Sequence, residues 1–226
     1  MADIKRIPSG IHGLDEKIDG GFEVGSVISL LGGPGSGKSL LGMSFLYEGL
    51  KNGETCLMVS FEESVDDLIS DMNTIGFKDI KDFINKKKLL LSFNSPVDFE
   101  YLGILDIIRE NNVSRVVIDS LSAISMYMDD KSKFRKFMLD LVTELKKLKV
   151  TAIATDEQPQ ISDSDTLYFS GEYLSDAVIK LFYTGLGGDF DRSLQVVKMR
   201  RTNNDRSMLP MRIDQGGIYV KWYRCW

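Results

Sequence analysis

Gly32-Gly33-Pro34-Gly35-Ser36-Gly37-Lys38-Ser39 matches the phosphate-binding P-loop pattern, which is a glycine, four free positions and Gly-Lys-Ser/Thr. Glycines allow the backbone to curl so that successive N–H groups point inward at phosphate oxygens. The apolar run 27–31 predicts a buried strand before the loop, and residues 40–50 predict a helix after it. This order places phosphates at a helix N-terminus, where the helix dipole favours anions. The segment therefore predicts a nucleoside triphosphate site.

Two side chains of this loop have predicted chemical roles. We expect Lys38 to reach the β- and γ-phosphates and the Ser39 hydroxyl to hold Mg²⁺. The predicted nucleotide-binding residues of the loop are Gly33, Pro34, Gly35, Ser36, Gly37, Lys38, Ser39 and Leu40.

The composition is that of a globular protein. The 226 residues are 43% hydrophobic and 27% charged, and this length predicts one domain over residues 1–226. The net charge of −5 argues against a dedicated nucleic-acid-binding protein, because phosphate contact needs a concentrated basic surface. The first residues lack an apolar signal core, and no apolar stretch has the length of a membrane helix. We therefore expect a cytoplasmic protein that does not span a membrane.

Apolar strand-like runs alternate with helical periodicity along the chain, which is typical of a parallel α/β sheet. Ser64, followed three residues later by Asp67, predicts the start of a helix that ends at Gly76. The predicted strands are 27–31, 55–61, 89–91, 113–118, 151–155, 177–183, 193–198, 208–213 and 218–220, and the other helices are 40–50, 102–109 and 134–148. A mostly parallel core with antiparallel strands at one edge fits this order.

Three acidic residues follow predicted strands. Asp119 ends an apolar run, and phosphoryl transfer needs a second magnesium-side acid, so we expect Asp119 to bind Mg²⁺ together with Ser39. Glu62 and Glu63 end the strand after the P-loop helix, where strand ends converge on the ligand. A carboxylate there can orient or deprotonate the attacking water, and we favour Glu62 for this role. The alternative is a charge pair at a helix start, because Ser64 begins a helix.

Lys198 and Arg200 lie at the end of a late strand. Alternation along a strand places both side chains on one face, and two cations on one face suit charge neutralisation at a γ-phosphate. A solvated basic edge that discourages strand pairing is the alternative. Spacing alone leaves both interpretations open.

Several segments together resemble the KaiC-like branch of the RecA superfamily. These segments are Arg6-Ile7-Pro8-Ser9-Gly10-Ile11-His12-Gly13-Leu14-Asp15, Gly20-Gly21-Phe22, the P-loop, Phe61-Glu62-Glu63, the Asp119 strand and Lys198-Met199-Arg200. The resemblance covers nearly the whole chain and is to single-domain members, such as the archaeal KaiC-like and RadA-paralogue proteins. It implies a RecA-like P-loop fold and an Mg²⁺-dependent ATP hydrolase.

The resemblance also implies roles for individual residues. Glu62 and Glu63 match the catalytic carboxylate pair, and Thr202 keeps the register of a nucleotide contact. Lys198 and Arg200 match fingers that reach the γ-phosphate of the neighbouring subunit. A homo-oligomer, either a ring or a filament, is therefore implied, with ATP between subunits and a regulatory role.

The chain departs from the family pattern in two places. Asn204 stands where a histidine is common, so contacts across the interface differ. Glu172 and Tyr173 match positions that are autophosphorylated Ser and Thr in the two-domain clock protein, which argues against an autokinase cycle.

Two other functions remain open at this point. One is a recombination mediator on single-stranded DNA, which the acidic net charge disfavours. The other is a nucleotide-gated interaction protein with slow hydrolysis, which Glu62 and the pair Lys198 and Arg200 disfavour.

Overall fold

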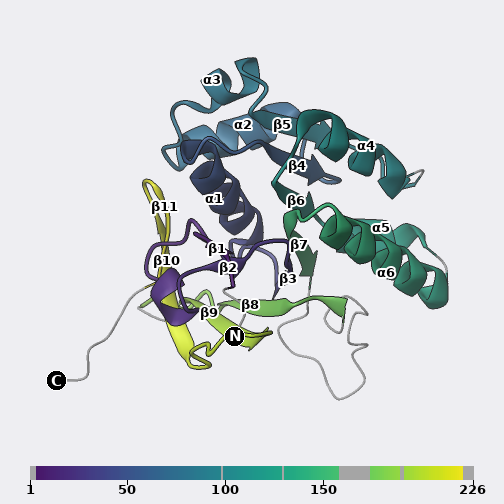
Figure 1. The fold of residues 1–226 in the computed structure, drawn as a ribbon. Helices are drawn as coiled ribbons and strands as arrows, with labels where there is room; N and C mark the ends of the chain where they lie inside the picture. Colours follow the sequence, from purple (N-terminus) through teal and green to yellow (C-terminus); the bar gives the residue numbers. More distant parts are fainter. Residues whose placement is uncertain (1–3, 98, 129, 158–173, 189–190, 221–226) are drawn as a thin grey trace.

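The structure is a computed structural model that describes residues 4–97, 99–128, 130–157, 174–188 and 191–220. Its centre is a nine-stranded sheet in the order β11-β10-β9-β8-β3-β7-β6-β4-β5 (Figure 1). The strands are β3 (Val27–Gly32), β4 (Cys56–Ser60), β5 (Leu89–Phe93), β6 (Arg115–Asp119), β7 (Thr151–Glu157), β8 (Ala177–Tyr183), β9 (Arg192–Met199), β10 (Met208–Asp214) and β11 (Gly217–Val220). A separate two-stranded sheet pairs β1 (Arg6–Ile7) with β2 (Phe22–Glu23).

The strands from β8 to β5 in this order are parallel to their neighbours, whereas β9, β10 and β11 are added antiparallel at one edge. This arrangement confirms the predicted α/β class, with a mostly parallel core and antiparallel strands at one edge. Parallel strands need helical crossovers, so helices cover both faces of the sheet. The helices are α1 (Lys38–Lys51), α2 (Val65–Thr74), α3 (Ile80–Asn85), α4 (Tyr101–Asn111), α5 (Leu121–Tyr127) and α6 (Lys131–Lys147), with a short 3-10 helix, η1 (Asp15–Lys17).

Two apolar clusters lie on opposite faces of the sheet. In β6, Val117 packs in the cluster that contains α1, while Val116 and Ile118 pack in the cluster that contains α5 and α6. Side chains alternate along a strand, so a strand that is buried on both faces needs an uninterrupted apolar run. This is why the central strands were recognisable in the sequence.

The predicted helix start at Ser64 is confirmed, because its Oγ accepts a hydrogen bond from Asp67 N at 3.3 Å. Two short helices, α3 and α5, were not predicted. Each has fewer than eight residues, which is too few to show helical periodicity in the sequence. In addition, α6 starts at Lys131 rather than at 134, because Asp130 caps it by accepting from Ser132 N at 2.7 Å.

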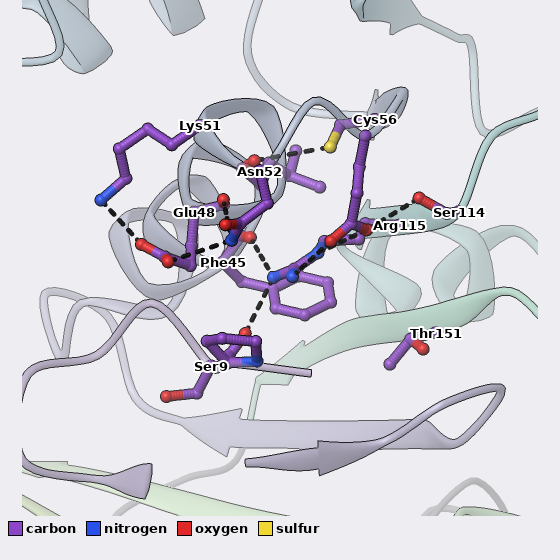
Figure 2. Close-up of polar contacts among 12 residues, drawn as sticks. Ser9, Phe45, Glu48, Lys51, Asn52, Cys56, Ser114, Arg115 and Thr151 are labelled. Atoms are coloured by element: carbon purple, nitrogen blue, oxygen red, sulfur yellow. Dashed lines mark hydrogen bonds and ion pairs between the residues drawn. The ribbon is translucent and has the colours of Figure 1, made fainter. Parts of the chain in front are cut away.

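A buried ion pair fixes the N-terminal segment to the sheet (Figure 2). Arg115, at the start of β6, is fully buried; its Nη2 lies 2.8 Å from Glu54 Oε1, and its Nη1 donates to the carbonyl oxygens of Pro8 and Phe45. Burial acts to raise the pKa of Glu54, but the hydrogen bond and charge of Arg115 outweigh it and lower that pKa. Removing one partner of a buried ion pair lowers the free energy of unfolding by about 3–5 kcal/mol, because the other charge is left buried without compensation. The guanidinium that Glu54 fixes also donates to Pro8 O at 2.9 Å and so holds Pro8 against the strand that ends in Asp119.

None of the helices within the described ranges is both long and apolar enough to cross a membrane.

Candidate active site

The P-loop connects β3 to α1. Gly37 caps α1 with a φ of 100°, and Gly35 has a φ of 72°, so both occupy the left-handed region that favours glycine. A Cβ at Gly32 would lie 2.6 Å from Ser36 Oγ, so a larger residue does not fit there. The first N–H groups of a helix have no intrahelical partner, and here they face the loop. The loop is thus built as an anion cradle.

Two side chains inside this cradle fit a bound phosphate. Lys38 is buried, and its ammonium donates to the carbonyl oxygens of Gly32 at 2.9 Å and Gly33 at 3.2 Å. Ser36 Oγ is buried and has no hydrogen-bond partner among the described residues. Because buried polar atoms are nearly always hydrogen-bonded, this hydroxyl indicates a ligand oxygen as its partner.

The carboxyl ends of the parallel strands bring the predicted acids to the P-loop side of the sheet. Ser60 pairs with Asp119 in the register of β4 and β6, and Gly32 pairs with Glu157 across β3 and β7. Asp119 is buried, and Thr155 Oγ1 donates a hydrogen bond to its Oδ1. The carboxylate is therefore held in one orientation at the edge of the sheet that carries the P-loop.

Glu62 and Glu63 follow β4 at the same edge but lie in different environments. Glu62 is exposed, and its Oε1 accepts a hydrogen bond from Ser120 Oγ at 2.6 Å. Glu63 is partly buried, and its Oε2 lacks a hydrogen-bond partner within the described part of the chain. Burial, followed by the negative charges of Asp119 and Asp71, raises the pKa of Glu63. Ser120 thus orients the Glu62 carboxylate, and the raised pKa makes the Glu63 carboxylate the stronger proton acceptor.

The predicted fingers lie at the amino ends of the parallel strands (the amino edge of the sheet), whereas the P-loop lies at their carboxyl ends (the carboxyl edge). Lys198 pairs with Val178 at the start of β8, and its Nζ donates to Ser175 O at 2.9 Å. Arg200 Nη1 lies 3.7 Å from Asp176 Oδ1, whose other oxygen accepts from Val27 N at the start of β3.

The P-loop begins at the other end of β3. This strand has six residues, which at ~3.3 Å per residue is roughly 17 Å of chain. Thr202 lies with the fingers, where its Oγ1 accepts from Arg6 Nη2 at 2.9 Å. A single subunit therefore separates Lys198, Arg200 and Thr202 from its own P-loop.

Four residues near the P-loop were not predicted from the sequence. Ser120 and Thr155 orient Glu62 and Asp119; Thr155 ends the predicted strand 151–155 and Ser120 directly follows Asp119, which was the available signal. Arg192 Nε donates to Gly35 O at 3.2 Å, and its guanidinium lies 4.2 Å from the centre of the Tyr183 ring. No sequence pattern indicated these last two contacts. The positions matched to autophosphorylation, 172 and 173, lie outside the described residues.

Comparisons with known proteins agree with this arrangement. The family model described as "ATPase: KaiC" matches residues 7–224. The chain is 31% identical over 220 residues to the circadian clock protein KaiC3 of Synechocystis sp., covering 95% of the chain and 43% of that relative. It is 32% identical over 221 residues to the circadian clock oscillator protein KaiC of Rippkaea orientalis, covering 96% of the chain and 42% of that relative.

Among solved structures, the KaiC-like protein PH0186 of Pyrococcus horikoshii superposes with a TM-score of 0.85 at 30% identity. That alignment covers 97% of the chain and 100% of the archaeal protein, whereas the chain spans less than half the length of the cyanobacterial relatives. The chain therefore belongs to the KaiC ATPase family of the RecA superfamily, and this membership supports nucleotide binding and ATPase activity.

Proposed function

We propose that this protein is an Mg²⁺-dependent ATP hydrolase that works as a homo-oligomer. Each ATP would lie between the P-loop edge of one subunit and the finger edge of the next. The observation that carries the proposal is the placement of Lys198 and Arg200 at the amino edge of the sheet, while the P-loop and Glu62 lie at the carboxyl edge. Stacking of subunits brings opposite edges together, as in heterologous assemblies that form rings or filaments.

On the P-loop side, the backbone amides of residues 33–40 and Lys38 would hold the phosphates. Ser39 and Asp119 would hold Mg²⁺, which supplies charge neutralisation at the β- and γ-phosphate oxygens. The orphan hydroxyl of Ser36 supports a phosphate ligand in this cradle. We propose that residues 1–226 act as one such ATPase domain.

The different environments of Glu62 and Glu63 support different roles toward the attacking water. Glu62, oriented by Ser120, would position the attacking water, and Glu63 would accept its proton. A carboxylate with a raised pKa accepts a proton more readily than an ordinary one, which favours Glu63 as the base. Lys198, Arg200 and Thr202 of the neighbouring subunit would approach the developing phosphate charge from the other side.

The raised pKa of Glu63 gives a pH test of this division. A base acts only when deprotonated, so kcat should fall as the pH drops through the pKa of Glu63, above the ordinary glutamate value of about 4.3. We expect Glu63→Gln and Glu62→Gln each to lower kcat about 10²-fold or more. Only Glu63→Gln should remove the acid limb of the pH profile. An acid limb that persists in Glu63→Gln and disappears in Glu62→Gln would reverse the two roles.

The intersubunit site predicts that hydrolysis depends on protein concentration. Phosphate release from Mg-ATP per mole of protein should rise with concentration, because dilution separates the P-loop from the fingers. The oligomeric mass should be measured at the same concentrations with ATP present. Activity that stays constant per subunit where the mass is that of a monomer would contradict the proposal.

A further inference from the structure

We infer that Arg6 is a positioning residue that holds the finger loop, residues 200–205, in the conformation that reaches the neighbouring subunit. This inference rests on the intersubunit site proposed above. The Arg6 guanidinium makes three hydrogen bonds, and two of them go to the finger loop. Nη2 donates to Arg201 O at 3.1 Å and to Thr202 Oγ1 at 2.9 Å, and Nη1 donates to Gly21 O at 2.9 Å. A planar guanidinium suits this task because its donors have fixed directions.

The rest of the finger loop is tied to the same N-terminal segment. Asn203 N donates to Asp19 Oδ2 at 2.8 Å. Asp205 N donates to the carbonyl of Lys17 at 3.0 Å, and Lys17 Nζ forms an ion pair of 3.0 Å with Asp205 Oδ2. Residues 6–23 therefore hold the loop along its length.

The Asp205 carboxylate accepts hydrogen bonds from Lys17 Nζ and from the backbone N–H and hydroxyl of Ser207. Hydrogen bonds from Ser207, and after them the one from Lys17, lower the pKa of Asp205 to about 2. The carboxylate is therefore charged at neutral pH, and its contact with Lys17 persists there.

A positioning element must itself be fixed, and the N-terminal segment is fixed at several points. Pro8 O accepts from the buried Arg115, and a Cβ at Gly10 would lie 2.4 Å from Ser44 O, so the segment packs closely on α1. A Cβ at Gly21 would lie 2.2 Å from Ile7 O, which shows how tightly β1 lies against the turn before β2. Arg6 therefore extends from a rigid base.

Arg200 itself is held by its backbone more than by its side chain. Its N–H donates to Asp176 O at 2.9 Å, whereas its guanidinium is 46% exposed and lies 3.7 Å from the Asp176 carboxylate. The direction of this exposed side chain therefore depends on the backbone around Arg200, and Arg6 binds the carbonyl oxygen of the next residue, Arg201. A catalytic group displaced by about 1 Å can lose roughly 10²-fold in rate. Loss of the Arg6 contacts should thus act on kcat rather than on ATP binding by the P-loop of the same subunit.

The test compares Arg6→Ala, Arg6→Lys and the control Lys5→Ala, which removes an exposed neighbouring cation. We expect Arg6→Ala to lower kcat roughly 10- to 100-fold with the Kd for ATP unchanged within about twofold. Arg6→Lys should recover part of the rate, because an ammonium replaces some of the hydrogen bonds without the planar geometry. Lys5→Ala should retain the wild-type rate. Asp205→Ala removes a separate tie to the same loop and should lower kcat in the same way, even where Arg6→Ala fails to fold.

Mixing experiments separate positioning of the fingers from general damage. Arg6→Ala subunits keep an intact P-loop and both glutamates, so they should regain activity when mixed with a Glu62→Gln/Glu63→Gln double variant that supplies intact fingers. They should gain nothing from Arg200→Ala subunits, which share the finger defect.

A wild-type kcat in Arg6→Ala and Asp205→Ala, with Arg200→Ala inactive, would overturn the role of Arg6 and leave the intersubunit site in place. A fully active Arg200→Ala would overturn the intersubunit site itself.

Discussion

Replacing Lys38 by alanine should lower ATP hydrolysis about 10²- to 10³-fold. The buried ammonium lies across the P-loop, where it donates to the carbonyl oxygens of Gly32 and Gly33. In this position it would neutralise the charge that develops on the transferred phosphate, and removal of one such donor typically costs 10²- to 10³-fold in kcat. Lys38 also contributes to holding the β- and γ-phosphates, so binding of Mg-ATP should weaken as well.

The matched control for this variant is Lys51→Ala. Lys51 lies at the other end of α1, where its exposed side chain pairs with Glu48 at 2.7 Å. Exposed pairs of this kind contribute little, so stability and hydrolysis should stay close to those of the wild type. Phosphate release and ATP binding should be measured for both variants, and only Lys38→Ala should lose them. Undiminished hydrolysis by a folded Lys38→Ala protein would refute the P-loop as the catalytic nucleotide site.

Replacing Arg200 by alanine should abolish hydrolysis and spare ATP binding. Arg200 lies at the amino edge of the sheet beside Asp176, far from the P-loop of its own subunit. An arginine finger that stabilises transition-state charge is worth about 10³- to 10⁵-fold in kcat. Because the nucleotide is held mainly by the P-loop of the neighbouring subunit, its Kd should change little.

Arg212→Ala is the control for loss of an exposed arginine from the antiparallel strands β9, β10 and β11. Arg212 lies in β10 and pairs with Asp214 at 2.8 Å. It should hydrolyse ATP at the wild-type rate. If Arg200→Ala and Arg212→Ala lose equal activity, the effect of Arg200 is one of surface charge and not of a finger.

The fold class, and the position of the P-loop between a strand and a helix, could be predicted from the sequence because their signals are local. A P-loop occupies eight consecutive residues. Asp119 directly follows an apolar run whose side chains are buried on both faces of the sheet. Carboxyl ends of parallel strands share one edge, so Glu62 and Asp119, which each come at the end of such a strand, could be expected near each other. In contrast, α3 and α5 are too short to show a helical period.

Contacts between distant residues could not be read from the sequence. Arg6 and Thr202 are 196 residues apart, and Ser120 and Glu62 are 58 residues apart. Their hydrogen bonds depend on the register of the sheet and on loop packing, which side-chain periodicity does not encode. The same is true of Lys198 and Arg200: spacing showed two cations on a strand end, but only the strand order shows that they lie at the edge away from their own P-loop.

The central claim is that each site is completed by a neighbouring subunit, and a mixture of two inactive variants tests it most directly. Arg200→Ala has an intact P-loop edge, and the Glu62→Gln/Glu63→Gln double variant has intact fingers. Neither should hydrolyse ATP alone. In a randomly mixed 1:1 assembly, half of the subunits have a working P-loop edge and half of their neighbours have working fingers, so roughly a quarter of the wild-type rate should return. A mixture that forms mixed oligomers and stays inactive would contradict the intersubunit mechanism.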